Sequence, residues 1–160
     1  MSQTKNLSLF HRLRGRVWHL YFRFARPVTM GVQGIVVDEQ RRVFLVRHSY
    51  VPGWHFPGGG VEAGETVLQA LARELREEGY LEITAAPRLH GVFFNNLYSR
   101  RDHVVVYIVP GFRQTAPRPP DAEIVECGFF PLDALPEATT RAARARLAEV
   151  FEGVAVSETW

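Results

Sequence analysis

Residues 58–80 read GGGVEAGETVLQALARELREEGY, a glycine-rich loop that runs into a helical pattern. Apolar residues recur at helical spacing, which predicts a helix from about Glu65 to Gly79. Its last turn crowds Glu74, Glu77 and Glu78, and like charges three or four residues apart repel by about 0.2–0.5 kcal/mol per pair. Either solvent screens that repulsion, or a positive group lies among the carboxylates.

The apolar side chains of this predicted helix fall on one arc, which must face the core. They are Val67, Leu68, Leu71, Ala72 and Leu75. The three glutamates fall on the neighbouring arc, at the edge of the predicted buried face, where unpaired acids are costly. Arg73 offsets part of this charge because Glu77 follows it by four residues. Carboxylates in this number suit Mg²⁺ or Mn²⁺; the alternative is a charged face held by arginines and solvent.

The glycine loop does not have the residues of a lysine-type phosphate-binding loop. Its spacing agrees with G-x-x-x-x-G-K-[ST], but Glu65 stands where the lysine belongs, and the reversed charge excludes that type of loop. A dinucleotide fingerprint also fails, because Gly58-x-Gly60 lacks a third glycine at the required distance. Phosphates bound beside so many acids would need a divalent cation as a bridge.

The same residues resemble the signature of the Nudix hydrolase family, G-x5-E-x7-R-E-U-x-E-E-x-G-U, where U is a bulky aliphatic residue. Gly59, Glu65 and the run Arg73–Glu78 agree with it in register. The chain departs from it after the acids, where Gly79 comes one residue early and Tyr80 follows. A glycine often ends a helix in the left-handed conformation. We therefore expect a helix shortened by one residue, with Tyr80 in the exit loop and the acids unaffected.

The resemblance covers roughly Val28 to Leu147 and implies an α/β fold, the Nudix-type α/β/α sandwich with a mixed β-sheet. It also implies a metal-dependent pyrophosphohydrolase that uses Mg²⁺ or Mn²⁺. Its substrate would be a nucleoside diphosphate linked to another moiety, such as a nucleotide sugar, a dinucleoside polyphosphate or a nucleoside triphosphate. The alternative is a non-catalytic binding or regulatory module with the same fold.

The resemblance also assigns roles by position. The implied metal ligands are the carbonyl of Gly58 and the carboxylates of Glu74, Glu77 and Glu78. Glu74 would be either a metal ligand or the base that activates water. Arg73 would orient the glutamates, and Glu65 would support the junction of loop and helix. In some members the base comes from a later loop, where Asp121 and Glu123 are candidates. Arg47 and Tyr98 are candidate substrate-binding residues.

Elsewhere, two β-rich runs at Val28–Asp38 and Arg42–His48 predict an antiparallel hairpin. Further strands are expected within residues 86–99, 102–111 and 123–132, with a proline-rich loop at 115–121. The sequence of residues 136–153 predicts a C-terminal helix that stops at Gly153.

The first 27 residues form a basic aromatic extension, predicted to be helical, to a domain at residues 28–160. Its stretch HRLRGRVWHLYFRFARP, residues 11–27, has five arginines, two histidines, four aromatic rings and no acid. A membrane-surface helix, a nucleic-acid patch and a packed helix compete here. Packing of Val17, Leu20, Tyr21 and Phe24 onto the domain is favoured because their spacing is helical, and no nucleic-acid module accompanies the patch.

The totals set the remaining expectations. A chain of 160 residues with 22% charged residues and a net charge of +2 is typical of one globular domain. The single cysteine, Cys127, excludes an internal disulfide, and no apolar run is long enough to span a bilayer. With no signal peptide recognised, we expect a cytoplasmic protein whose partner is a small nucleotide, and a homodimer is compatible with this prediction.

Overall fold

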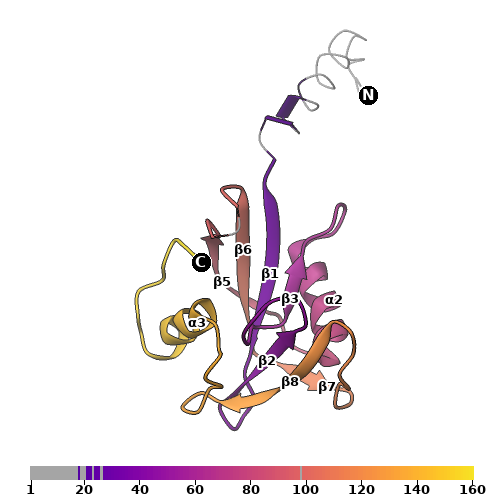
Figure 1. Cartoon of the computed structure of the whole chain (residues 1–160), viewed down its shortest axis with the longest axis vertical. Helices are drawn as coiled ribbons and strands as arrows, with labels where there is room; N and C mark the ends of the chain where they lie inside the picture. The colour runs from indigo at the N-terminus through magenta and orange to yellow at the C-terminus, as the bar shows by residue number, and fades with distance from the viewer. Residues whose placement is uncertain (1–17, 19–20, 23, 26, 98) are drawn as a thin grey trace, which may run out of the picture.

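A mixed four-stranded sheet forms the centre of the molecule, in the order β3-β1-β6-β5 (Figure 1). The computed structural model describes residues 18, 21–22, 24–25, 27–97 and 99–160. β1 (Thr29–Val36) pairs with β6 (Asp102–Val109) in parallel and with β3 (Gly58–Gly60) antiparallel. β5 (Arg88–Phe94) runs antiparallel to β6. The expected mixed sheet is confirmed.

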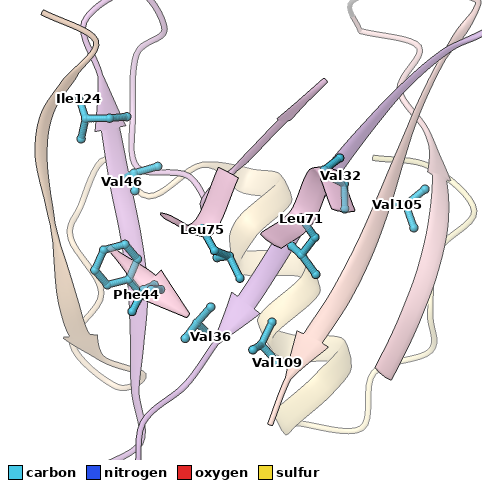
Figure 2. Close-up of a cluster of buried hydrophobic side chains, with 11 residues drawn as sticks. Val32, Val36, Phe44, Val46, Leu71, Leu75, Val105, Val109 and Ile124 are labelled. Carbon is cyan, nitrogen blue, oxygen red and sulfur yellow. The ribbon is translucent and has the colours of Figure 1, made fainter. Parts of the chain in front are cut away.

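The two helices of the domain pack on opposite faces of this sheet. α2 (Val67–Gly79) inserts Leu71 and Leu75 into a core with Val32 and Val36 of β1, which Figure 2 shows. α3 (Arg141–Phe151) forms a second core on the other side of β1, as the alternation of side chains along a strand requires. The α/β class and the α/β/α sandwich are therefore confirmed.

The predicted hairpin between the first two strands is wrong. β2 (Arg42–His48) pairs with β8 (Ile124–Pro131) in a separate two-stranded sheet, and a single antiparallel bridge between Val37 and Val43 joins it to the end of β1. Both edges of β1 are taken, one by β6 along all of its length and the other by β3. β2 therefore leaves the central sheet directly after the turn.

Two short strands were not predicted from the sequence. β4 (Leu81–Ile83) follows α2 directly and pairs antiparallel with β7 (Phe112–Gln114). Three residues are too few for a periodic pattern to be recognised. The strands expected at residues 86–99, 102–111 and 123–132 are confirmed, as is the C-terminal helix, beyond which Gly153 has φ of 73°.

The end of α2 differs from the expectation drawn from its glycine. Gly79 is the last helical residue, and Tyr80 takes the left-handed cap position with φ of 53° and ψ of 37°. A Cβ on Gly79 would lie 2.8 Å from both the Phe44 ring and the Leu81 side chain. Gly79 is thus required for packing, and Tyr80 adopts the conformation that the signature's glycine would supply, so the helix is not shortened.

The helical residues before β1 are exposed rather than packed on the domain. Trp18, Tyr21, Phe22 and Phe24 are 54%, 60%, 40% and 73% exposed. The packing predicted for Tyr21 and Phe24 is therefore wrong, while Val17 and Leu20 lie outside the described residues. Within the described part of the chain, no helix is long and apolar enough to cross a bilayer.

Candidate active site

A capping box fixes the point at which the glycine loop becomes α2. The Thr66 hydroxyl accepts a hydrogen bond from the Gln69 N–H at 3.2 Å, and the Gln69 side chain accepts one from the Thr66 N–H at 2.8 Å. This reciprocal bonding satisfies two donors that a helix start leaves open. It starts α2 at a defined residue, and the glutamates follow from there at helical spacing.

The buried face of α2 is rotated from the one predicted. Leu68, expected in the core, is 45% exposed, whereas Ala70 is fully buried. Glu74 and Glu78 consequently lie within the buried face, at 9% and 4% exposure, rather than at its edge. The buried face was predicted wrongly because it was placed from the apolar residues alone, on the expectation that carboxylates avoid the interior.

Two glycines of β3 allow close approaches at this site, Gly59 by the Glu74 carboxylate and Gly58 by the backbone of β1. A Cβ on Gly59 would lie 2.2 Å from one Glu74 carboxylate oxygen. A Cβ on Gly58 would lie 2.0 Å from the Val32 carbonyl oxygen. The Glu74 carboxylate therefore lies directly against the backbone of β3, an approach that only glycine allows.

Arg73 ties the loop to the helix. Its Nε and Nη2 donate to the two Glu65 carboxylate oxygens at 3.0 and 3.1 Å, and Nη2 also donates to the Gly60 carbonyl at 3.0 Å. Its Nη1 donates to Glu74 at 2.7 Å and to Glu77 at 3.4 Å. These contacts link Glu65, Glu74 and Glu77 to one guanidinium, and the orienting role of Arg73 and the supporting role of Glu65 stay predictions.

Glu78 lies deeper and lacks such a cation. Its carboxylate accepts a hydrogen bond from the Gly58 N–H at 2.7 Å and faces His48 Nε2 at 3.3 Å. Burial raises the pKa of Glu78 to about 8, against the opposing effect of the Gly58 N–H. Burial and the charge of His55 also lower the pKa of His48, which disfavours a protonated ring beside Glu78. Among the described residues, no lysine or arginine forms an ion pair with Glu78.

Glu74 has a related environment. Burial raises the pKa of its carboxyl group, although Arg73 opposes this, and the nearby charges of Glu77 and Glu123 add to the rise. Acids whose ionised form is disfavoured by burial and by one another are stabilised when a cation binds between them.

The donor set fits a hard divalent cation, since it consists of carboxylates packed against the glycine backbone of β3. Glu77, with a side chain 61% exposed, is free to turn toward the other two acids. As they stand, no three acidic, histidine or cysteine side chains of the described residues converge on one point. Of the predicted ligands, Gly58, Glu74 and Glu78 lie together, whereas the mostly exposed side chain of Glu77 contacts, at 3.4 Å, the Arg73 guanidinium that also binds Glu74.

The loop after β7 reaches this end of α2. Arg118 donates from Nε to the Glu77 carbonyl at 2.7 Å and from Nη2 to Asp121 at 2.7 Å. Asp121 also accepts from the N–H groups of Glu123 and Ile124, both at 2.8 Å, so each of its oxygens has a partner. Sequence reasoning missed Arg118, because nothing local in a proline-rich loop indicates a partner 41 residues earlier.

Glu123 is exposed, and its charge contributes to the raised pKa values of Glu74 and Glu78. The Tyr50 hydroxyl lies 3.3 Å from its carboxylate, and the charges of Glu123, Glu78 and Glu74 all raise the pKa of Tyr50 together with burial. Of the two loop acids predicted as alternative bases, the structure brings Glu123 toward the site and engages Asp121 in holding the loop. Tyr50 was not singled out from the sequence.

The predicted substrate-binding residues are placed differently. Arg47 pairs with Glu126 at 2.8 Å and lies over the Trp54 ring, at 5.8 Å. The β2–β8 pairing shifts register between Arg47 and His48, and it is His48, not Arg47, that meets Glu78. The structure does not bring Arg47 to the carboxylates, and Tyr98 lies outside the described residues.

An α/β/α sandwich that holds arginine-bound glutamates against a glycine-rich strand is the arrangement that the resemblance to the Nudix hydrolases implied. A family model described as the NUDIX domain matches residues 27–151, and the chain belongs to this family. The resemblance recognised in the glycine loop and its helix is thereby confirmed.

Similar proteins agree with this assignment. A MutT NUDIX hydrolase from Burkholderia pseudomallei superposes with a TM-score of 0.66 at 27% identity, covering 76% of this chain and 97% of that one. A Bacillus subtilis protein named as a proposed 8-oxo-dGTP diphosphatase is 29% identical over 110 residues, or 68% of this chain and 73% of that protein.

An RNA pyrophosphohydrolase from Halorhodospira halophila is 54% identical over 44 residues, which is 28% of this chain. The matched stretch spans about a quarter of that protein's length, 24%.

Proposed function

We propose that this chain is a metal-dependent pyrophosphohydrolase that cleaves the diphosphate linkage of a nucleoside diphosphate joined to another moiety. The observation that carries the proposal is Glu78, a carboxylate at 4% exposure that faces His48 and forms no ion pair with a lysine or arginine of the described residues. A buried acid without a cationic partner is strongly disfavoured. A divalent cation would remove that penalty and would link the acid to the phosphates of a substrate.

Gly58, Glu74 and Glu78 are the proposed ligands, and Glu77 would complete them by rotation of its exposed side chain. The cation, Mg²⁺ or Mn²⁺, neutralises diphosphate charge and lowers the pKa of a water molecule when it is bound. Arg73 orients Glu74 through the 2.7 Å hydrogen bond and favours its ionised form, while Glu65 holds Arg73 at the loop. The acids are thus positioned before substrate arrives, which is how a site of this kind lowers a barrier.

Two acids compete for the role of general base. Glu74 lies nearest the other proposed ligands but is occupied by Arg73. Glu123 is exposed and has only the Tyr50 hydroxyl as a side-chain partner among the described residues, so it is free to accept a proton from water. We favour Glu123 as the base and Glu74 as a ligand. Asp121 serves as the matched control, because both of its oxygens hold the loop.

The test is turnover by the purified chain with Mg²⁺ or Mn²⁺ on nucleotide sugars, dinucleoside polyphosphates, nucleoside triphosphates and 5′-triphosphorylated RNA, with products identified by chromatography. Glu78→Gln should abolish turnover and weaken Mn²⁺ binding measured by calorimetry. Glu82→Gln, at a half-exposed acid paired with Arg113, should leave both unchanged.

A non-catalytic binding module is the competing function. It would be established if no substrate class were turned over and Glu78→Gln bound Mn²⁺ as the parent does. Turnover confined to one class would identify the moiety attached to the nucleoside diphosphate.

A further inference from the structure

One end of the domain combines exposed apolar rings with unpaired arginines. We propose that this basic–aromatic end, formed by Trp18, Tyr21, Phe24, Leu97, Arg100 and Arg101, docks onto an anionic lipid bilayer surface. The helical residues precede β1, and the turn between β5 and β6 lies near the start of that strand (Figure 1). The proposal concerns where the protein resides and is independent of the reaction proposed above.

The apolar part of this end is exposed on helical residues. Trp18, Tyr21 and Phe24 are 54%, 60% and 73% exposed, and the Trp18 and Tyr21 rings meet edge to face at 6.0 Å. The exposure continues in Val28 at 58% and in Leu97 at 80%. Exposed large apolar side chains gathered on neighbouring segments are typical of a site of association. Tryptophan and tyrosine in particular are favoured at the boundary between lipid and water.

The arginines are held at the start of β1, the strand that follows the helical residues. The Thr29 N–H donates to the Arg101 carbonyl at 2.9 Å, which fixes the turn that carries Arg100 and Arg101 against the start of β1. Both arginines are exposed, and neither forms an ion pair within the described residues. The acid nearest to them in sequence, Asp102, is already engaged by the Thr29 hydroxyl at 2.7 Å and by the Asn95 amide at 2.8 Å.

The N-terminal part of the chain is basic and the remainder is acidic. Residues 1–26 contain six of the 19 lysines and arginines and none of the 17 acids, which leaves 13 basic and 17 acidic residues for the remainder. An anionic bilayer attracts each basic residue near its surface by about 1 kcal/mol. The acidic body is repelled by the same surface, so the charge distribution orients the molecule with its basic–aromatic end toward lipid.

A bilayer accounts for more of this end than RNA does. RNA would use the arginines for phosphates and the rings for stacking on bases. RNA has no hydrocarbon region that would bury the exposed aliphatic side chains of Val28 and Leu97. An interfacial segment buries aromatic and aliphatic groups together while its basic residues meet headgroups.

The experiment is flotation of the full-length protein with vesicles of phosphatidylcholine alone and of phosphatidylcholine mixed with phosphatidylglycerol. We expect binding to the anionic vesicles, weakened by high salt because screening reduces the attraction. Arg100→Ala/Arg101→Ala should weaken partitioning by about thirtyfold if each arginine contributes as estimated for basic residues. Trp18→Ser/Phe24→Ser should reduce binding to both bilayer compositions.

The matched control is Arg88→Ala/Arg113→Ala, which removes two exposed arginines where β6 ends and β7 follows. This variant should bind anionic vesicles to the same extent as the parent. A thermal melting transition like that of the parent would establish that each variant folds. Equal binding to neutral and anionic vesicles, or equal loss in both arginine pairs, would overturn the proposal. So would tighter binding to single-stranded RNA than to anionic vesicles, with the same dependence on Arg100 and Arg101.

Discussion

Adjacent glycines in β3 allow a sharp test of how the active site is built. A Cβ added to Gly59 would lie 2.2 Å from a Glu74 oxygen and 2.6 Å from its carboxyl carbon, whereas one added to Gly60 meets nothing within 4 Å. Neither glycine has a left-handed φ, so the comparison does not include backbone strain. Gly59→Ala and Gly60→Ala therefore differ in their effect on Glu74.

The magnitude follows from the distance. Ordinary contact to a Cβ begins at 3.4 Å, so Gly59→Ala must displace the Glu74 carboxylate by about 1 Å, and misplacement of that size costs about 100-fold in rate. The same shift weakens the charge-assisted bond from Arg73, worth about 1.5–3 kcal/mol. We expect Gly59→Ala to lose about two orders of magnitude in kcat and to melt at a lower temperature.

The assay is nucleotide release under saturating substrate, together with thermal melting of both variants without metal. Gly60→Ala should resemble the parent in both measurements. If Gly59→Ala kept full activity, or if both variants lost activity equally, Glu74 would not act from its position against β3, and the reasoning would be refuted.

Three further predictions concern stability, each measured by chemical denaturation without metal. Gly79→Ala should lower the free energy of unfolding by up to about 2 kcal/mol, because overpacking against its neighbours exceeds the gain in helix propensity. Tyr80→Gly should raise it by up to about 1 kcal/mol by releasing left-handed strain. A stabilising Gly79→Ala together with a destabilising Tyr80→Gly would contradict both assignments. The pKa of Glu78 is raised in the fold to about 8, so the native state binds its proton more tightly than the unfolded state; stability should fall as pH rises from 5 to 8, and Glu78→Gln should flatten that decline. Arg146→Ala should cost about 3–5 kcal/mol, because Arg146 is 1% exposed and its loss leaves the buried Glu149 carboxylate without its guanidinium partner, and a loss below 1 kcal/mol would count against that pairing.

Sequence alone predicted the parts of this protein whose spacing carries information. The helix at residues 67–79 and its acids were recognised because apolar period and family spacing agree there. Burial of Glu74 and Glu78 was not recognised, because a helical projection assigns acids to the surface and cannot include the glycines that accommodate them.

Pairing between distant segments was the main failure. The turn after β1 has the polar residues of a hairpin, but competition from β3 and β6 decides which strands β1 joins. Arg118 and Tyr50 were missed for the same reason, since each reaches the acids from a loop remote in sequence. The exchange at Gly79 and Tyr80 was misread because a glycine was taken as a conformational requirement where it is a packing one.

The parallel pairing of β1 with β6 also bears on how the protein folds. The two strands are 73 residues apart at their first pair, and β2, β3, α2, β4 and β5 are all made between them. Contacts so distant in sequence require a long loop to close first, which slows folding. The helix that carries the acids is therefore synthesised well before the strand that completes its supporting sheet. Metal affinity should consequently appear late in refolding, together with the global transition.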